Sequence, residues 1–167
     1  MKRYLIVTCL MLAVILTAQA QSLGRTYKTA LGFKFYPGGV TLKHFVKNNA
    51  ALEGIGYFWN NGFRITGLYE YHGNINGAPG LKWYIGPGAH IGFWNDRYFR
   101  DRHWDENDRW DDRNRTYVGL DGVLGLDYKI NKVPINLSLD WQPSISFGKG
   151  YTDTDPHFGG IAIRFAF

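Results

Sequence analysis

Residues Pro134–Phe147 read PINLSLDWQPSISF, a run in which apolar and polar side chains alternate. Every odd position from Ile135 onward holds an apolar residue or proline, and every even position from Asn136 holds a polar one. A period of two places all the apolar groups on one face of an extended strand. Strands of globular proteins average about 5–6 residues, whereas a transmembrane β-strand needs roughly 9–11. The run is therefore long enough to cross a bilayer.

The rest of the chain also predicts strands and shows no convincing helical period. Strand-like runs are separated by clusters of Gly, Asn, Pro and Asp, which favour turns. Eight strands are expected, at about Tyr27–Tyr36, Val40–Val46, Ala50–Trp59, Phe63–His72, Leu81–Trp94, Thr116–Ile130, Pro134–Phe147 and Phe158–Phe167. An even number of strands places both ends of a closed meander on one side.

The lengths of the connections test this topology. If both ends face the periplasm, the long connections 95–115 and 148–157 face outside, and the short turns 47–49 and 131–133 face inside. Outer-membrane barrels have this asymmetry. Residues 73–80 are the exception, because they are long for a periplasmic turn.

The N-terminal residues have the form of a signal peptide. A basic start at Lys2 and Arg3 precedes the mostly apolar run Leu5–Thr17, and Ala18–Ala20 has the small-x-small form of a cleavage site. The apolar run is shorter than the about 20 residues of a transmembrane helix. We expect residues 1–20 to be removed, leaving residues 21–167 as one barrel domain.

Cysteine content and charge exclude several classes of site. The only cysteine, Cys9, lies in the expected signal peptide, so we expect no disulfide and no thiolate metal site. The formal charge of +5 includes Lys2 and Arg3, which leaves +3 after cleavage and gives no case for nucleic acid.

The C-terminal run Ile161–Phe167 alternates as well and stops on phenylalanine. A final amphipathic strand ending in an aromatic residue resembles the assembly signal of bacterial outer-membrane β-barrels. With the signal peptide, the chain resembles the small eight-stranded OmpA-like and OmpX-like barrels. The resemblance implies an all-β, antiparallel, up-and-down transmembrane barrel in the outer membrane of a Gram-negative bacterium. It also implies Sec export and assembly by the barrel-insertion machinery, and it carries over no functional residue; we expect a monomer.

A soluble barrel or sandwich remains the alternative, because secreted lipocalin-like barrels alternate too. The long runs and the matching termini argue against it. So does the charge, which lies mostly in loops or on one strand face.

The inward face is expected to carry charges of both signs, which pair in a narrow lumen. The candidate lumen network consists of Lys34, Arg64, Glu70, Asp121, Asp140 and Arg164. Asp140 is expected to pair with an arginine such as Arg64 or Arg164. Glu53 joins the network if it points inward, which would turn Ile55, Tyr57 and Trp59 inward unless a bulge intervenes. About eight strands leave an interior just wide enough for side chains to fill.

These features predict a non-enzymatic barrel that supports the envelope or presents its outer loops to a ligand or partner. The alternative is porin-like or gated transport through the lumen. Loop 95–115 mixes arginines, acids and aromatics, which suit lipopolysaccharide phosphates or a protein partner. Its candidate contact residues are Arg97, Arg100, Trp104, Arg109 and Trp110. Its acidic residues do not match a calcium-binding loop of the EF-hand type, so we expect no metal and no cofactor.

A third reading is a lipid A-modifying barrel enzyme. A deacylase-like site would need a histidine beside a serine, oriented by a carboxylate. None of the five histidines has a serine two residues away. Ser144 and Ser146 face inward, with Asp140 near them, but the sequence places no histidine beside them. We therefore expect no catalytic residues.

Overall fold

The alternating runs fold as strands that close into a barrel. The structure is a computed structural model that describes residues 26–60, 62–95, 114–148 and 151–167. The expected signal peptide and most of loop 95–115 lie outside these residues. Among the described residues, no helix is long and apolar enough to cross a membrane. The strands are β1 Thr29–Lys34, β2 Gly39–Lys47, β3 Ala50–Trp59, β4 Gly62–Asn74, β5 Leu81–Asn95, β6 Asn114–Lys129, β7 Ile135–Trp141, β8 Ser144–Gly148, β9 Tyr151–Asp155 and β10 Gly159–Ala166.

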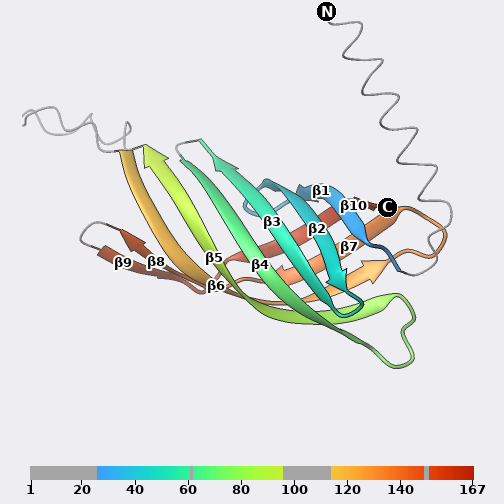
Figure 1. Cartoon of the computed structure of the whole chain (residues 1–167). Coiled ribbons are helices and arrows are strands. Elements are labelled where there is room, and N and C mark those ends of the chain that lie inside the picture. The colour runs from blue at the N-terminus through green and yellow to red at the C-terminus, as the bar shows by residue number, and fades with distance from the viewer. Residues whose placement is uncertain (1–25, 61, 96–113, 149–150) are drawn as a thin grey trace, which may run out of the picture.

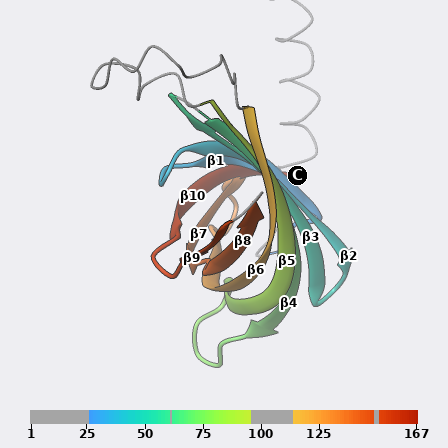
Figure 2. The ribbon, with the colours of Figure 1, turned by 90° about the vertical axis from the view of Figure 1, so that its left-hand side faces the viewer.

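The barrel is antiparallel, and its closed ring consists of eight strands, or staves, as expected. Strands β1 to β6 pair in chain order, β6 pairs with β7, β7 with β10, and β10 with β1, which closes the ring. Seen from one end, the strands surround a common axis (Figure 2). The predicted strand Pro134–Phe147 is divided into β7 and β8 at Gln142 and Pro143, and both parts pair with β6.

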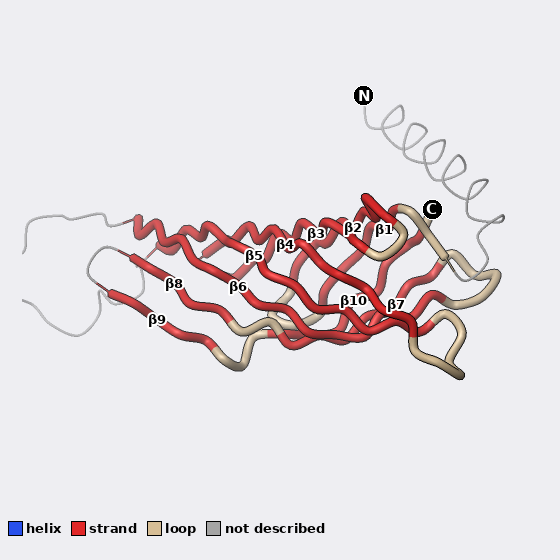
Figure 3. The backbone as a smooth tube through the Cα atoms, turned by 60° about the horizontal axis from the view of Figure 1, so that its bottom comes forward, coloured by secondary structure: helices blue, strands red, loops and turns tan. Residues whose placement is uncertain are grey.

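One expected loop is wrong in part. Residues 148–157 contain β9, which pairs with β8 from Ser144 opposite Asp155 to Gly148 opposite Tyr151. The segment alternates threonine with aspartate, and β-branched threonine favours strands. The β8–β9 hairpin lies at the end of the barrel opposite the C-terminus (Figures 1 and 3).

The two ends of the barrel are called the near end, which is the one at the C-terminus, and the far end, which is the opposite one. The near end holds the C-terminus and connections 48–49, 75–80 and 130–134, and the far end holds connection 35–38 and the β8–β9 hairpin (Figure 1). The long near-end connection 75–80 is a folded turn. The main-chain N–H of Ala78 donates to the oxygen of Ile75, and that of Leu81 to Ala78.

The predicted faces of the strands are confirmed. In β7, Leu139 is 55 % exposed and Asp140 is 7 % exposed. The same alternation holds in β4, where Arg64 and Glu70 are buried and Ile65 is exposed. The barrel thus turns most of its large apolar side chains outward and its charged side chains inward.

Strand β3 points Glu53 inward without a bulge of its own. Glu53, Ile55 and Tyr57 are all at most 2 % exposed. The register shift lies in β2, between Phe45 and Lys47. The interior therefore contains an apolar cluster as well as charges. Its members are Ile55, Tyr57, Leu68, Tyr84, Val123 and Phe158, with Trp59 partly buried against them.

Closure between β1 and β10 depends on a glycine. Gly32 lies opposite Arg164, and a Cβ atom at Gly32 would overlap the main-chain oxygen of Ile163. The seam is completed at the near end by a reciprocal pair of main-chain hydrogen bonds between Thr29 and Phe167, of 2.9 and 2.8 Å.

We expect Gly32→Ala to lower the free energy of unfolding by about 1–3 kcal/mol, because overpacking forces the two strands apart. The measurement is urea unfolding of the refolded protein in detergent micelles. Gly54→Ala is the matched control, since a Cβ there has no atom within 4 Å. Equal stabilities of the two variants would contradict the role of Gly32 at the seam.

Candidate functional site

The interior of the barrel holds a balanced set of charges. Among the described residues, five lysine or arginine side chains and five aspartate or glutamate side chains are buried. The basic ones are Lys34, Lys43, Arg64, Lys129 and Arg164, and the acidic ones are Glu53, Glu70, Asp121, Asp127 and Asp140. A buried charge is costly unless it is paired and hydrogen-bonded. Nine of these ten side chains are compensated by the ion pairs described below, and Lys129 donates instead to the main-chain oxygens of Ile130 and Val133 at 2.9 and 2.7 Å.

The first group is centred on Lys43 in β2. Its Nζ lies 2.8 Å from Glu70 Oε2, 3.0 Å from Glu53 Oε2 and 3.6 Å from Asp127 Oδ1. The hydroxyl of Tyr27 donates to Asp127 at 3.0 Å. One ammonium group thus links acids from three other strands, β3, β4 and β6.

The second group is centred on Arg164 in β10, which forms an ion pair with Glu53. Its Nη1 also donates to Asn136 Oδ1 at 3.1 Å and to Ser138 Oγ at 2.8 Å. Glu53 therefore joins the first two groups, because it forms ion pairs with both Arg164 and Lys43.

Asp140 has a different partner from the one expected. Its Oδ1 accepts from Lys34 Nζ at 2.7 Å, and its Oδ2 accepts from the hydroxyl of Tyr84 at 2.9 Å. The prediction of an arginine partner is wrong because Arg164 is bound by Glu53 and Arg64 by Asp121. The flexible lysine reaches Asp140 from β1, across β10.

The third group lies toward the far end, around Asp121 in β6. Arg64 forms an ion pair with Asp121 Oδ1, and Gln142 Nε2 donates to the same oxygen at 3.1 Å. Arg64 is held from its other side, since its Nε donates to Thr66 Oγ1 at 3.1 Å.

The second oxygen of Asp121 binds a histidine that is itself bound to a serine. Asp121 Oδ2 lies 2.7 Å from His90 Nδ1, and His90 Nε2 lies 3.0 Å from Ser146 Oγ. The three side chains come from β6, β5 and β8. A chain of hydrogen bonds therefore runs from Arg64 through Asp121 and His90 to Ser146.

Register and one glycine bring His90 to Ser146. His90 lies opposite Gly119, and Gly119 lies opposite Ser146, so the three positions form one row across β5, β6 and β8. A Cβ atom at Gly119 would overlap the His90 ring. The imidazole therefore occupies the space of the missing side chain and reaches the second strand away.

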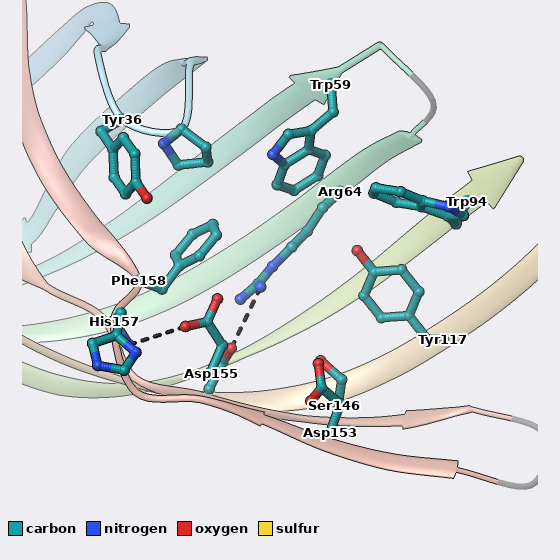
Figure 4. A pocket seen from close by; sticks show the side chains of 12 residues that line it. Tyr36, Trp59, Arg64, Trp94, Tyr117, Ser146, Asp153, Asp155, His157 and Phe158 are labelled. Carbon is teal, nitrogen blue, oxygen red and sulfur yellow. Dashed lines mark hydrogen bonds between the residues drawn. The ribbon is translucent and has the colours of Figure 1, made fainter. Parts of the chain in front are cut away.

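The row ends at a cavity of about 440 Å³ at the far end. Ser146 and Arg64 line this cavity, and Figure 4 shows them among the side chains around it. Aromatic rings make up much of the remaining wall, contributed by Tyr36, Trp59, Trp94, Tyr117 and Phe158. Asp153, Asp155 and His157 line the side formed by β9 and the segment after it.

The six predicted lumen residues are all buried in the interior. The prediction from the sequence does not include four further members of this network, which are Lys43, Asp127, His90 and Ser146. The alternation along each strand indicates that these side chains face inward. It does not show which residues they contact, because that depends on the register between strands.

The candidate contacts Arg97, Arg100, Trp104, Arg109 and Trp110 lie outside the described residues. Within the described part of the chain, no three His, Cys, Asp or Glu side chains are grouped to hold a metal ion.

Comparison with known proteins adds no relative. No protein-family model matches the chain, and neither the curated proteins nor the solved structures contain a match.

We expect Glu53→Gln to lower the free energy of unfolding by about 3–5 kcal/mol, because it leaves Lys43 and Arg164 without their shared carboxylate. Urea unfolding in detergent micelles measures the change. Asp153→Asn removes an exposed carboxylate of β9 and should stay within about 0.5 kcal/mol of the wild type. A loss at position 53 no larger than that at 153 would contradict the central role of Glu53.

Proposed function

We propose that the chain is an integral β-barrel of the outer membrane of a Gram-negative bacterium, with a lumen filled by side chains. The observation that carries this proposal is the reversed distribution of polarity across the barrel wall. Charged groups such as Lys34 and Arg164 are at most 2 % exposed, whereas Leu120 is 62 % exposed and Phe33 is 64 % exposed.

The apolar outer face extends over every stave of the ring. Exposed large apolar side chains include Leu31, Leu42, Leu52, Ile65, Ile85, Leu120, Leu139 and Ile163. The largest apolar patch on a typical soluble monomer is about 300–600 Å², and a surface of this kind on all sides would associate in water. Lipid chains are the solvent that suits it.

Aromatic side chains lie toward both ends of this face. Phe63 stacks between Phe58 and Phe93 with centroid distances of 5.5 and 6.2 Å, and Tyr71 contacts Trp83 at 6.0 Å. Phe63 and Tyr71 are eight positions apart in β4, which is about 26 Å along the strand. Membrane barrels have an apolar band about 25 Å tall between two aromatic girdles, and tilt shortens the span along the axis.

The paired interior supports a closed barrel in preference to a conducting one. Lys43, Arg164, Lys34 and Arg64 are each bound to carboxylates, so that an ion path would require several pairs to separate together. We propose that the barrel supports the envelope and presents its outer connections, as expected for loop 95–115, to lipopolysaccharide, a ligand or a partner. Transport through the lumen remains the competing proposal.

We expect Leu139→Arg to reduce insertion into lipid vesicles, because arginine at the bilayer midplane costs about 2–4 kcal/mol. Insertion is measured as the fraction of protein that keeps the faster, heat-modifiable migration on unheated gels. Thr152→Arg is the control, since Thr152 is exposed in the β8–β9 hairpin. A soluble barrel would tolerate both changes and would fold without detergent or lipid.

We expect no steady conductance from the refolded protein in planar bilayers. Neutralising one partner of a pair, as in Asp140→Asn, should lower stability without opening a path. Reproducible single-channel steps whose ion selectivity changes in Asp140→Asn would favour transport over the closed barrel.

A further inference from the structure

We propose that Ser146, His90 and Asp121 form a catalytic triad that hydrolyses carboxylic esters in the far-end cavity. The proposal goes beyond the proposed envelope role and does not depend on the membrane location. From the sequence alone we expect no catalysis, because no serine lies beside a histidine along any strand. The barrel register supplies this neighbour from another strand.

The hydrogen bonds assign a role to each atom. An ionised carboxylate can only accept, so the neutral imidazole of His90 donates its Nδ1–H to Asp121 at 2.7 Å and presents Nε2 as an acceptor. Nε2 then accepts from the Ser146 hydroxyl at 3.0 Å. A nucleophile bonded to a base that a carboxylate orients is the arrangement by which such triads are recognised on unrelated folds.

The orienting carboxylate is itself fixed. Arg64 and Gln142 both bind Oδ1 of Asp121, so Oδ2 is directed to His90. The His90 side chain is fully buried, and its ring packs edge-on against Tyr117 at a centroid distance of 5.7 Å. Arg64 and Gln142 are positioning residues, because they act on the base through Asp121.

The nucleophile is the member of the triad that meets the cavity. Ser146 is partly exposed and lines the cavity, whereas Asp121 is buried behind it. The aromatic wall suits an apolar acyl or aryl group, because such rings bury apolar surface well. Among the described residues that line the cavity, Arg64 is the one arginine or lysine. The substrate class is therefore a carboxylic ester with an apolar acyl group.

The reaction balances without a cofactor. Ser146 Oγ attacks the ester carbonyl carbon while its proton passes to His90 Nε2. The bond from the carbonyl carbon to the alcohol oxygen breaks, and His90 returns the proton to the leaving alcohol. Water then attacks the acyl-serine, gives a proton to His90, and releases the carboxylic acid as Ser146 regains its hydrogen.

Labelling with a fluorophosphonate tests the nucleophile directly. The reagent forms a bond between Ser146 Oγ and phosphorus and releases fluoride, and the adduct is located by mass spectrometry of the intact protein and its peptides. We expect one adduct at Ser146 in the wild type and none in Ser146→Ala. His90→Gln should slow labelling by about 10²–10⁴-fold, the usual contribution of a general base.

Folding is controlled in the same samples. Heat-modifiable migration counts the folded fraction, and rates are compared per folded molecule. Ser138→Ala is the matched control, because Ser138 is a buried lumen serine bound to Arg164 in the second group. It should be labelled at Ser146 at the wild-type rate. A folded wild-type protein that is not labelled at Ser146, or is labelled equally in His90→Gln, would overturn the triad.

Two ester sources separate in the turnover assay. The p-nitrophenyl ester of butyric acid in detergent micelles reports on small soluble esters, and fatty-acid release from vesicles of phospholipid and lipopolysaccharide reports on membrane lipids. Loss of either activity in Ser146→Ala supports hydrolysis and identifies the source. Labelling without turnover of either ester would overturn the hydrolytic assignment.

Discussion

Compensation of charge in the barrel interior is the constraint on which the rest of the structure depends. A ring of eight strands encloses little more than the volume of its own side chains, and in this chain charged groups share that volume with an apolar cluster. Glu53 is the central member, because it binds both Lys43 and Arg164 and so connects strands β2, β3 and β10. Each of these ions would be costly alone in such an interior. The pairs Arg164–Glu53 and Lys34–Asp140 span the β1–β10 seam and can form only when the ring has closed in the correct register, so closure and neutralisation depend on each other.

The same constraint explains how much could be predicted from the sequence. Period-two patterns specified the strands and their faces, and even the inward turn of Ile55 and Tyr57 followed from placing Glu53 inside. The partners could not be predicted in this way, because register and the reach of long side chains decide them. Asp140 binds Lys34 across β10, and no spacing along the chain indicates that contact. Strand β9 is not predicted, because its short alternating run resembles a polar loop.

The candidate triad could not be predicted from the sequence either. Neighbours on one face of a single strand are two residues apart, and no histidine has a serine at that spacing. In a sheet the neighbours also lie across strands, and Gly119 extends that reach by one strand because it has no side chain. A glycine on an inward face can therefore indicate a contact between the side chains of the two strands that flank it.

The alternation of faces also restricts how the length of this chain can change during evolution. Removing one residue from a stave would send every side chain beyond it to the opposite face, placing charges outside and leucines within. Insertions and deletions inside the ring should therefore survive mainly in pairs, or where a register shift such as that between Phe45 and Lys47 absorbs the odd residue. The connections between the strands can gain or lose any number of residues without changing which face a side chain occupies. Differences in length should therefore accumulate in the connections, while the strands of the ring keep their number of residues.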